Sequence, residues 1–312
     1  MKRRQILAAT AATGMLAALP ARAQSTKIVV GFTAVTDFAS AFVAAEEGFF
    51  KKRNLDVEMK FIPINSTIPA AVQAESLQIG GPTPSVFLQA VDGGLDHVIV
   101  AGAGITSKAL TSFGLVAKAG SGIRSAKDCV GRTIGVPGLG AFLHVTFRGW
   151  LKSQGVDYRK VNFVEAAFPQ HGDMLRGGSV EAVVSADPFM SRITDSGMGY
   201  VASYYSTFLP DGQPTIVYSA RRDWATKNAG AARGFQQAIQ EAAAFMVKPG
   251  NDAKVRAAIG KFIKLPPEIL AKAQISPPGP VINDKQVAYW VNLMKDQDML
   301  KGSIDAAKIL FR

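Results

Sequence analysis

The feature that most constrains this chain is an alternation of short apolar runs with helical segments, which recurs from residue 27 to about residue 204. Runs such as 27–32, 133–136 and 180–185 have the length and the β-branched content of buried strands. The segments between them carry apolar residues at helical spacing. This β-α-β-α pattern is typical of a mainly parallel sheet covered by helices. The sequence therefore predicts an α/β fold.

From residue 229 onward the pattern is only helical. Asn283, followed three residues later by Gln286, predicts a capping box at the start of one helix. We therefore expect a helical C-terminal part, with helices at 231–247, 252–263, 267–272, 284–297 and 304–310.

The first 23 residues have the composition of an export signal. Lys2, Arg3 and Arg4 precede an apolar core at 6–19, and Ala21-Arg22-Ala23 fits the usual cleavage pattern. We predict a signal peptide over residues 1–23, cleaved after Ala23, and a periplasmic protein. The chain has 312 residues, so the remainder is long enough for two domains.

Charge and cysteine content exclude several classes of protein. The formal net charge is +11, but the basic residues are scattered, and the notable clusters, 51–53 and 221–222, are short. We therefore expect no nucleic-acid partner. Cys129 is the single cysteine, which leaves no internal disulfide.

Catalytic and metal-binding patterns are missing from the sequence. Of the three histidines, only His171 has a second ligand type at metal spacing, Asp173, which is too little for a site. The serine-hydrolase, zinc-protease and phosphate-loop motifs do not occur. We therefore predict a protein that is not an enzyme, with no metal site and no cofactor.

The stretch from Thr133 to His144 reads as a strand, a glycine turn and the first turn of a helix. Gly138 and Gly140 let the backbone turn tightly and approach a ligand. The first N–H groups of a helix have no internal partner and carry the positive end of its dipole. Such a turn holds an anion or a polar ligand oxygen, although the glycines are equally explained by turn geometry.

Small and polar residues recur at the ends of four predicted strands. They are 36–38, 83–85, 138–141 and 187–189. In open α/β sheets, ligands bind outside the carboxyl ends of the strands. Two sheets that face each other would bring these four loops to one cleft. Asp37 and Asp187 have a second interpretation as helix caps.

Several segments, in this order and spacing, resemble one family. They include Ala44-Ala45-Glu46-Glu47-Gly48-Phe49-Phe50, Ile79-Gly80-Gly81-Pro82-Thr83-Pro84-Ser85, the run from Ile123 to Val136, and Asp187-Pro188. The chain resembles the substrate-binding proteins of ABC importers of the nitrate/sulfonate/taurine type, which include thiamine-precursor binders. The resemblance implies a periplasmic-binding-protein type II fold, in which two αβ lobes close on a ligand cleft. We place the crossings between lobes near 111 and 223, so that lobe I spans 24–110 and 224–312 and lobe II spans 111–223.

The resemblance implies a monomeric extracytoplasmic solute-binding protein that delivers a small molecule to the membrane permease of an ABC importer. We predict a small organic ligand, whether aromatic, sulfonated or pyrimidine-like. One alternative is an enzyme of the thiamine-pyrimidine-synthase type on the same fold. Another is a binding protein that serves a sensor rather than an importer.

Site residues follow from the same four loops. We expect backbone N–H groups at Gly140 and Ala141 to meet an acceptor on the ligand, and Asp187 either to accept from a ligand amine or to cap its helix. The family often has a serine where Leu139 stands, and Ala186 replaces a common aromatic residue. The predicted ligand-binding residues are Asp37, Phe38, Thr83, Ser85, Gly138, Leu139, Gly140, Ala141, His144, Asp187 and Phe189, with Phe168 as a further aromatic wall.

Overall fold

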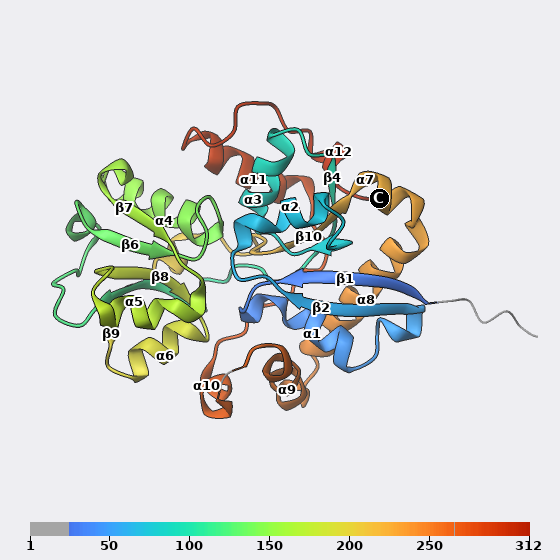
Figure 1. Ribbon diagram of the computed structural model, residues 1–312, viewed down its shortest axis with the longest axis horizontal. Helices are drawn as coiled ribbons and strands as arrows, with labels where there is room; N and C mark the ends of the chain where they lie inside the picture. The colour runs from blue at the N-terminus through green and yellow to red at the C-terminus, as the bar shows by residue number, and fades with distance from the viewer. Residues whose placement is uncertain (1–24, 265) are drawn as a thin grey trace, which may run out of the picture.

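The computed structural model describes residues 25–264 and 266–312, which form two lobes, each built on a five-stranded sheet (Figure 1). The predicted signal peptide lies outside these residues. The first sheet has the order β2-β1-β3-β10-β4, with β1 at Thr26–Phe32, β2 at Leu55–Phe61, β3 at Ile79–Gly80, β4 at His97–Gly102 and β10 at Val217–Arg221. The second has the order β7-β6-β8-β5-β9, with β5 at Phe113–Lys118, β6 at Thr133–Val136, β7 at Asn162–Glu165, β8 at Ala182–Ala186 and β9 at Gly199–Ser203.

Both sheets are mixed, and for the same reason. Successive β-α-β units make β1 parallel to β2 and β3, and β6 parallel to β7 and β8. The strand that enters each lobe from the other one runs in the opposite direction, so β10 is antiparallel to β3 and β4, and β5 is antiparallel to β8 and β9. The predicted α/β fold with two lobes is confirmed.

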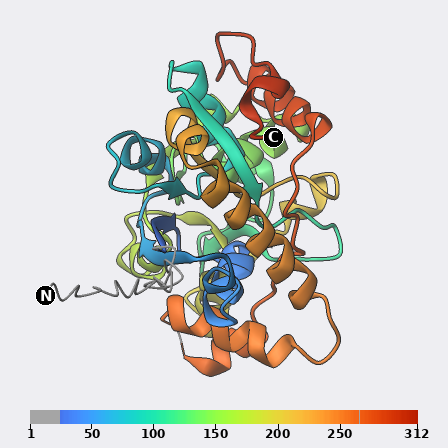
Figure 2. The same ribbon diagram turned by 90° about the vertical axis from the view of Figure 1, so that its right-hand side faces the viewer.

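Aromatic rings bind the helices of lobe I together. Helix α1 (Ala39–Glu46) packs against α8 (Ala229–Met246) and α9 (Asp252–Phe262). Phe42 stacks on Phe262 with ring centroids 4.8 Å apart, and all three helices bury their apolar faces in this way. Figure 2 faces this lobe and shows the C-terminal helices extending from its bottom to its top.

Each lobe contains further helices. Lobe I also contains α2 (Ile68–Gln73), α3 (Pro84–Asp92) and α7 (Arg222–Lys227), and lobe II contains α4 (Phe142–Ser153), α5 (His171–Gly177) and α6 (Phe189–Asp195). In α4, Leu143, Phe147 and Leu151 are buried, as predicted from their spacing, which places them on one face of the helix. Within the described ranges, no helix is both long and apolar enough to cross a membrane.

The second crossing between the lobes comes earlier than the sequence suggests. We expect it near residue 223, but β10 already pairs with β3 and β4 in the first sheet. The chain therefore returns to lobe I between Ser203, where β9 ends, and Val217. The apolar run that ends at Ala220 identifies a strand, but it does not tell which sheet the strand joins.

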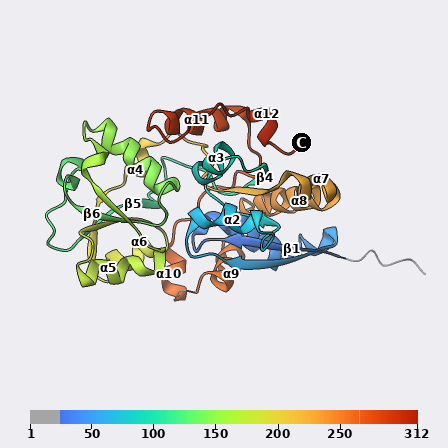
Figure 3. The same ribbon diagram turned by 45° about the horizontal axis from the view of Figure 1, so that its top comes forward.

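The C-terminal helices are α10 (Pro267–Lys272), α11 (Asp284–Lys295) and α12 (Ala306–Ile309), and α11 contacts both lobes. It lies beside α3 of lobe I (Figure 3). On the other side, the Trp290 ring packs on Phe142 of α4 with centroids 5.3 Å apart, and Gln297 Nε2 donates to the carbonyl of Val145 over 3.0 Å. The helical C-terminal part therefore belongs to lobe I by connection and bridges to lobe II by contact.

Two predicted helix caps have opposite outcomes. The capping box is confirmed, because Gln286 N–H donates to Asn283 Oδ1 and Asn283 N–H donates to Gln286 Oε1, each over 3.0 Å. The cap by Asp37 is wrong. Its side chain makes no capping bond to the 3-10 turn at 36–38 or to α1, and it accepts hydroxyl hydrogen bonds from distant segments instead.

His171 fixes α5 to β8 inside lobe II. Its Nε2 donates to the carbonyl of Ala166 over 3.0 Å, so its Nδ1 accepts from the hydroxyl of Ser185 over 3.1 Å. The ring is fully buried, and this burial lowers the pKa of His171 to about 4. The native protein therefore holds His171 neutral at a pH at which the unfolded chain takes up a proton.

The free energy of unfolding should consequently fall as the pH drops from about 6.5 to about 4. His171→Gln removes this titration and should reduce the pH-dependent loss by up to about 3 kcal/mol. Urea unfolding at a series of pH values measures the effect. Ser185→Ala is the control, because it removes the hydrogen bond but keeps the imidazole, and so retains the pH dependence. Identical pH profiles for His171→Gln and the wild type would contradict this assignment.

Candidate ligand-binding cleft

A cavity of about 50 Å³ lies where the two lobes meet. Lobe I contributes Thr33, Val35, Asp37, Asn65 and Thr83, lobe II contributes Phe113, Pro137, Ala141, Phe142, Leu143, Phe168 and Ala186, and the second crossing contributes Thr215 and Ile216. Most of these residues follow the carboxyl ends of parallel strands, as expected for a ligand site on open α/β sheets. A larger hollow of about 670 Å³ lies along β4 and the C-terminal residues and is confined to lobe I.

Asp37 is the ionisable side chain of this cavity. Its Oδ1 accepts hydrogen bonds from the hydroxyls of Thr215, over 2.5 Å, and Ser276, over 3.0 Å. Burial raises the pKa of Asp37 above its ordinary value, and these two hydrogen bonds oppose the rise. Among the residues that the structure describes, no lysine, arginine or histidine lines the cavity.

Thr83 joins the two lobes through one oxygen. It is the N-cap of α3, and its Oγ1 accepts from Val86 N–H over 3.4 Å and from Phe142 N–H of lobe II over 3.2 Å. Asn65 holds Thr83 in place, since its Oδ1 accepts from Thr83 N–H over 2.8 Å. The hydroxyl oxygen of Ser85 lies 3.1 Å from the same Thr83 oxygen, within hydrogen-bond distance. Ser85 is fully buried and does not line the cavity.

The backbone N–H groups that lack an acceptor at the N-terminus of α4 are not the ones that the sequence predicts. Gly140 N–H donates to Nδ1 of His144 over 2.9 Å, and Ala141 N–H donates to the carbonyl of Gly138 over 3.1 Å. With Phe142 N–H on Thr83, the next two N–H groups, those of Leu143 and His144, have no acceptor within the described part of the chain. The donors predicted at Gly140 and Ala141 are therefore occupied, and those of the following residues are available.

The other residues of the glycine turn shape the helix start without lining the cavity. Gly140 has φ +77°, a left-handed conformation that glycine adopts without strain. Gly138 is buried beside Asn65. Leu139 is 46% exposed, and its N–H donates to Glu165 Oε2 over 2.6 Å. Ala141 alone of the four predicted positions lines the cavity.

His144 stabilises the turn rather than facing the cavity. Since Nδ1 accepts from Gly140, the ring proton is on Nε2, which is buried without a partner and lies in a ring that packs on Phe163 at 4.6 Å. Burial, with a smaller contribution from Arg148, lowers the pKa of His144 to about 3. A neutral imidazole is what this hydrogen bond requires.

Three further predicted residues lie outside the cavity lining. Asp187 Oδ1 accepts from Ser191 N–H over 3.2 Å in the manner of a helix cap, and its Oδ2 accepts from Gln274 N–H over 3.0 Å. Phe38 is buried in the core of lobe I, where it packs on Phe32 and Tyr218. Phe189 stacks on Phe168, which does line the cavity.

Sequence reasoning missed Asn65, Thr33 and Thr215. Asn65 follows β2 and Thr33 follows β1, so the rule that ligands bind at strand ends would have included both. Thr215 carries no such signal, because it lies in an irregular segment before β10.

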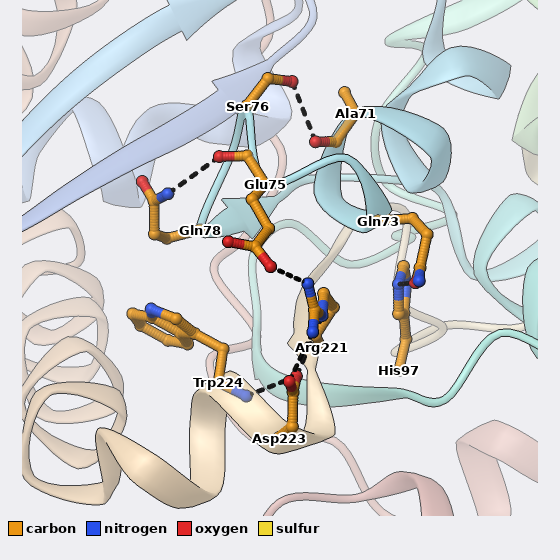
Figure 4. A network of polar contacts seen from close by, with 9 residues as sticks. All are labelled: Ala71, Gln73, Glu75, Ser76, Gln78, His97, Arg221, Asp223 and Trp224. Carbon is orange, nitrogen blue, oxygen red and sulfur yellow. Dashed lines mark hydrogen bonds and ion pairs between the residues drawn. The ribbon is translucent and has the colours of Figure 1, made fainter.

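Arg221, from one of the basic clusters in the sequence, lies away from the cleft. Figure 4 shows its guanidinium between the carboxylates of Glu75 and Asp223, with which it forms ion pairs. Nearby, His97 Nε2 is 3.2 Å from Gln73 Oε1. The two carboxylates neutralise Arg221, which is therefore not free to bind an anion.

Two sheets of this topology around a shared cavity define a periplasmic-binding-protein fold. The family model described as "NMT1/THI5 like" matches residues 35–253, and the chain belongs to this family. The predicted resemblance to substrate-binding proteins of the nitrate/sulfonate type is thereby confirmed.

Two curated relatives share low identity over most of the chain. The nitrate/nitrite binding protein NrtA of Synechococcus elongatus is 24% identical over 251 residues, 72% of this chain and 56% of NrtA. The nitrate import ATP-binding protein NrtC of a Synechocystis strain is 23% identical over 80% of this chain and 39% of its own length. The chain thus spans little more than half of NrtA and less than half of NrtC.

Solved structures agree in fold. The alkanesulfonate-binding protein SsuA from Xanthomonas axonopodis pv. citri, bound to MOPS, has a TM-score of 0.77 at 17% identity and covers 93% of this chain and 99% of SsuA. The periplasmic nitrate-binding protein NrtA from Synechocystis PCC 6803 has a TM-score of 0.73 at 15% identity, over 91% of this chain and 84% of that protein.

The hydrogen bond between the lobes can be tested at Thr83. Thr83→Val keeps the shape of the side chain but leaves the buried N–H of Phe142 without an acceptor, and should cost about 1–3 kcal/mol of stability. Thr83→Ser keeps the hydroxyl and should cost less. Chemical unfolding measures the difference, and amide hydrogen exchange at Phe142 should be faster only in Thr83→Val. Equal stability and equal exchange in the two variants would show that this bond does not hold the lobes together.

Proposed function

We propose that this protein captures a small organic solute between its lobes and delivers it to an ABC importer. The observation that carries the proposal is the cavity at the lobe junction, which residues of both lobes and of the second crossing enclose. A ligand that touches both lobes stabilises the closed form over the open one, because it makes its full set of contacts only there. Binding is thereby coupled to a change of shape that a membrane partner recognises.

The size of the cavity supports a small ligand in this arrangement of the lobes. A cavity of about 50 Å³ holds a few water-sized groups, since about 10–15 Å³ by this measure is enough for one water molecule. A larger ligand requires the lobes to part. Phe113, Phe142 and Phe168 would provide aromatic walls for a planar molecule, and Thr33, Thr83 and Asn65 polar contacts.

The names of the relatives support the proposed partner and location. NrtA is named a binding protein and NrtC an import ATP-binding protein, which supports an importer permease and ATPase as partners of this chain. The residues that precede the described part carry the composition of a signal peptide and support export to the periplasm. We propose a monomer with a binding role rather than a catalytic one, in keeping with the names of these relatives.

A thermal-shift screen of the chain from Gln24 onward tests this function. The panel includes nitrate, sulfonates, aromatic acids, amides and thiamine precursors. A ligand present at a hundred times its dissociation constant should add about 2.7 kcal/mol to the free energy of unfolding. Small-angle scattering with that ligand should show a more compact protein. If no compound in the panel raises the melting temperature, the solute-binding function is contradicted.

A further inference from the structure

The charge of the cavity lining restricts the choice of ligand more than the volume of the cavity does. The NrtA relatives are named for nitrate and nitrite, which are anions. The cavity here has a carboxylate in its wall and no basic side chain in its lining. Asp37 Oδ1 accepts hydrogen bonds from two hydroxyls, and an anion with acceptor atoms only would meet this carboxyl group without a donor to offer it, and with a like charge whenever the group is ionised.

The carboxylate is held in a fixed position. Thr215 reaches Oδ1 of Asp37 from the second crossing, and Ser276 reaches the same atom from the segment between α10 and α11. Gly104 leaves room for this cluster, because a Cβ atom there would lie 2.9 Å from Asp37 Oδ1 and 2.9 Å from Thr215 Oγ1. Two separate segments therefore orient one carboxyl group, which keeps part of its surface open to the cavity.

The start of α4, which also lines the cavity, has the opposite electrostatic preference. The first turn of α4 faces the cavity through Leu143, and the N–H groups of Leu143 and His144 have no acceptor within the described residues. They lie at the positive end of the helix dipole and suit an acceptor atom. One positive helix end does not make the site selective for anions, because the carboxyl group of Asp37 lines the same small cavity.

We infer that the ligand of this cleft carries no net negative charge and donates at least one N–H hydrogen bond to Asp37. The inference rests on the proposed solute-binding function and narrows it. An acceptor atom on the same molecule meets the first turn of α4. Amides, ureas and aminopyrimidines have this combination of groups, whereas nitrate and simple alkanesulfonates have acceptors only.

Three planar molecules of nearly the same size test the inference: nitrate, urea and guanidinium. Each has four non-hydrogen atoms, and they differ in charge and in whether they donate hydrogen bonds. Calorimetric titration should show that urea or guanidinium binds at least ten times more tightly than nitrate. In Asp37→Asn this preference should fall at least tenfold, because the carboxylate is replaced by a neutral group of the same shape. Asp56→Asn, an exposed carboxylate on β2, is the matched control and should behave as the wild type.

Each other outcome overturns the inference. Nitrate binding as tightly as urea and guanidinium would show that Asp37 does not select the charge, while solute binding itself would stand. An unchanged preference for urea or guanidinium over nitrate in Asp37→Asn would show that residues other than Asp37 select the ligand. Binding by none of the three probes would exclude a ligand of this class and size, and the broader screen then decides separately whether the protein binds any solute. The melting temperature of Asp37→Asn without ligand shows that the variant is folded.

Discussion

One oxygen atom, Oγ1 of Thr83, links the starts of two helices that belong to different lobes. It caps α3 in lobe I and accepts from Phe142 at the start of α4 in lobe II, so the two helix N-termini meet at a single acceptor. Asn65 fixes that acceptor from the loop after β2. Gln274 adds a second connection, since its N–H donates to Asp187 of lobe II and its carbonyl accepts from Thr36 of lobe I. The cavity exists because these contacts bring loops of both lobes together.

Two electrostatic preferences coexist in this small space. Each helix N-terminus carries about half a positive charge, and two of them converge at Thr83. Asp37 places a carboxyl group in the lining of the same cavity, where the described residues include no basic side chain. A small anion satisfies the helix ends and conflicts with Asp37, whereas a molecule with both donor and acceptor groups satisfies both. The fold common to nitrate-binding and sulfonate-binding proteins is therefore compatible with a different ligand chemistry here, because that chemistry is set by side chains on the loops.

The architecture was predictable from the sequence, and the details of the site were only partly so. Apolar runs and helical spacing identify strands such as β6 and helices such as α4, because burial dictates the residue types at these positions. The loops that line the cleft follow from the strand ends, and Asp37, Thr83 and Ala141 do line it. His144 and Asp187 turned instead to local partners, Gly140 and Ser191, which depends on backbone geometry that residue spacing does not fix. Thr215 and Ser276 reach Asp37 from 178 and 239 residues away, beyond any local pattern.

The distance between the lobes in solution shows most directly whether a ligand bound at Asp37 draws the two lobes together. Spin labels on cysteines at Lys60 of lobe I and Lys160 of lobe II, both exposed, report this distance by double electron–electron resonance. Cys129 is buried, and burial raises the pKa of its thiol to about 12, so it stays unlabelled. We predict that the compound with the largest thermal shift narrows the distribution and moves it to shorter distances, and that Asp37→Asn abolishes this change. A distribution that is the same with and without the compound, or a response that Asp37→Asn retains in full, would contradict this prediction.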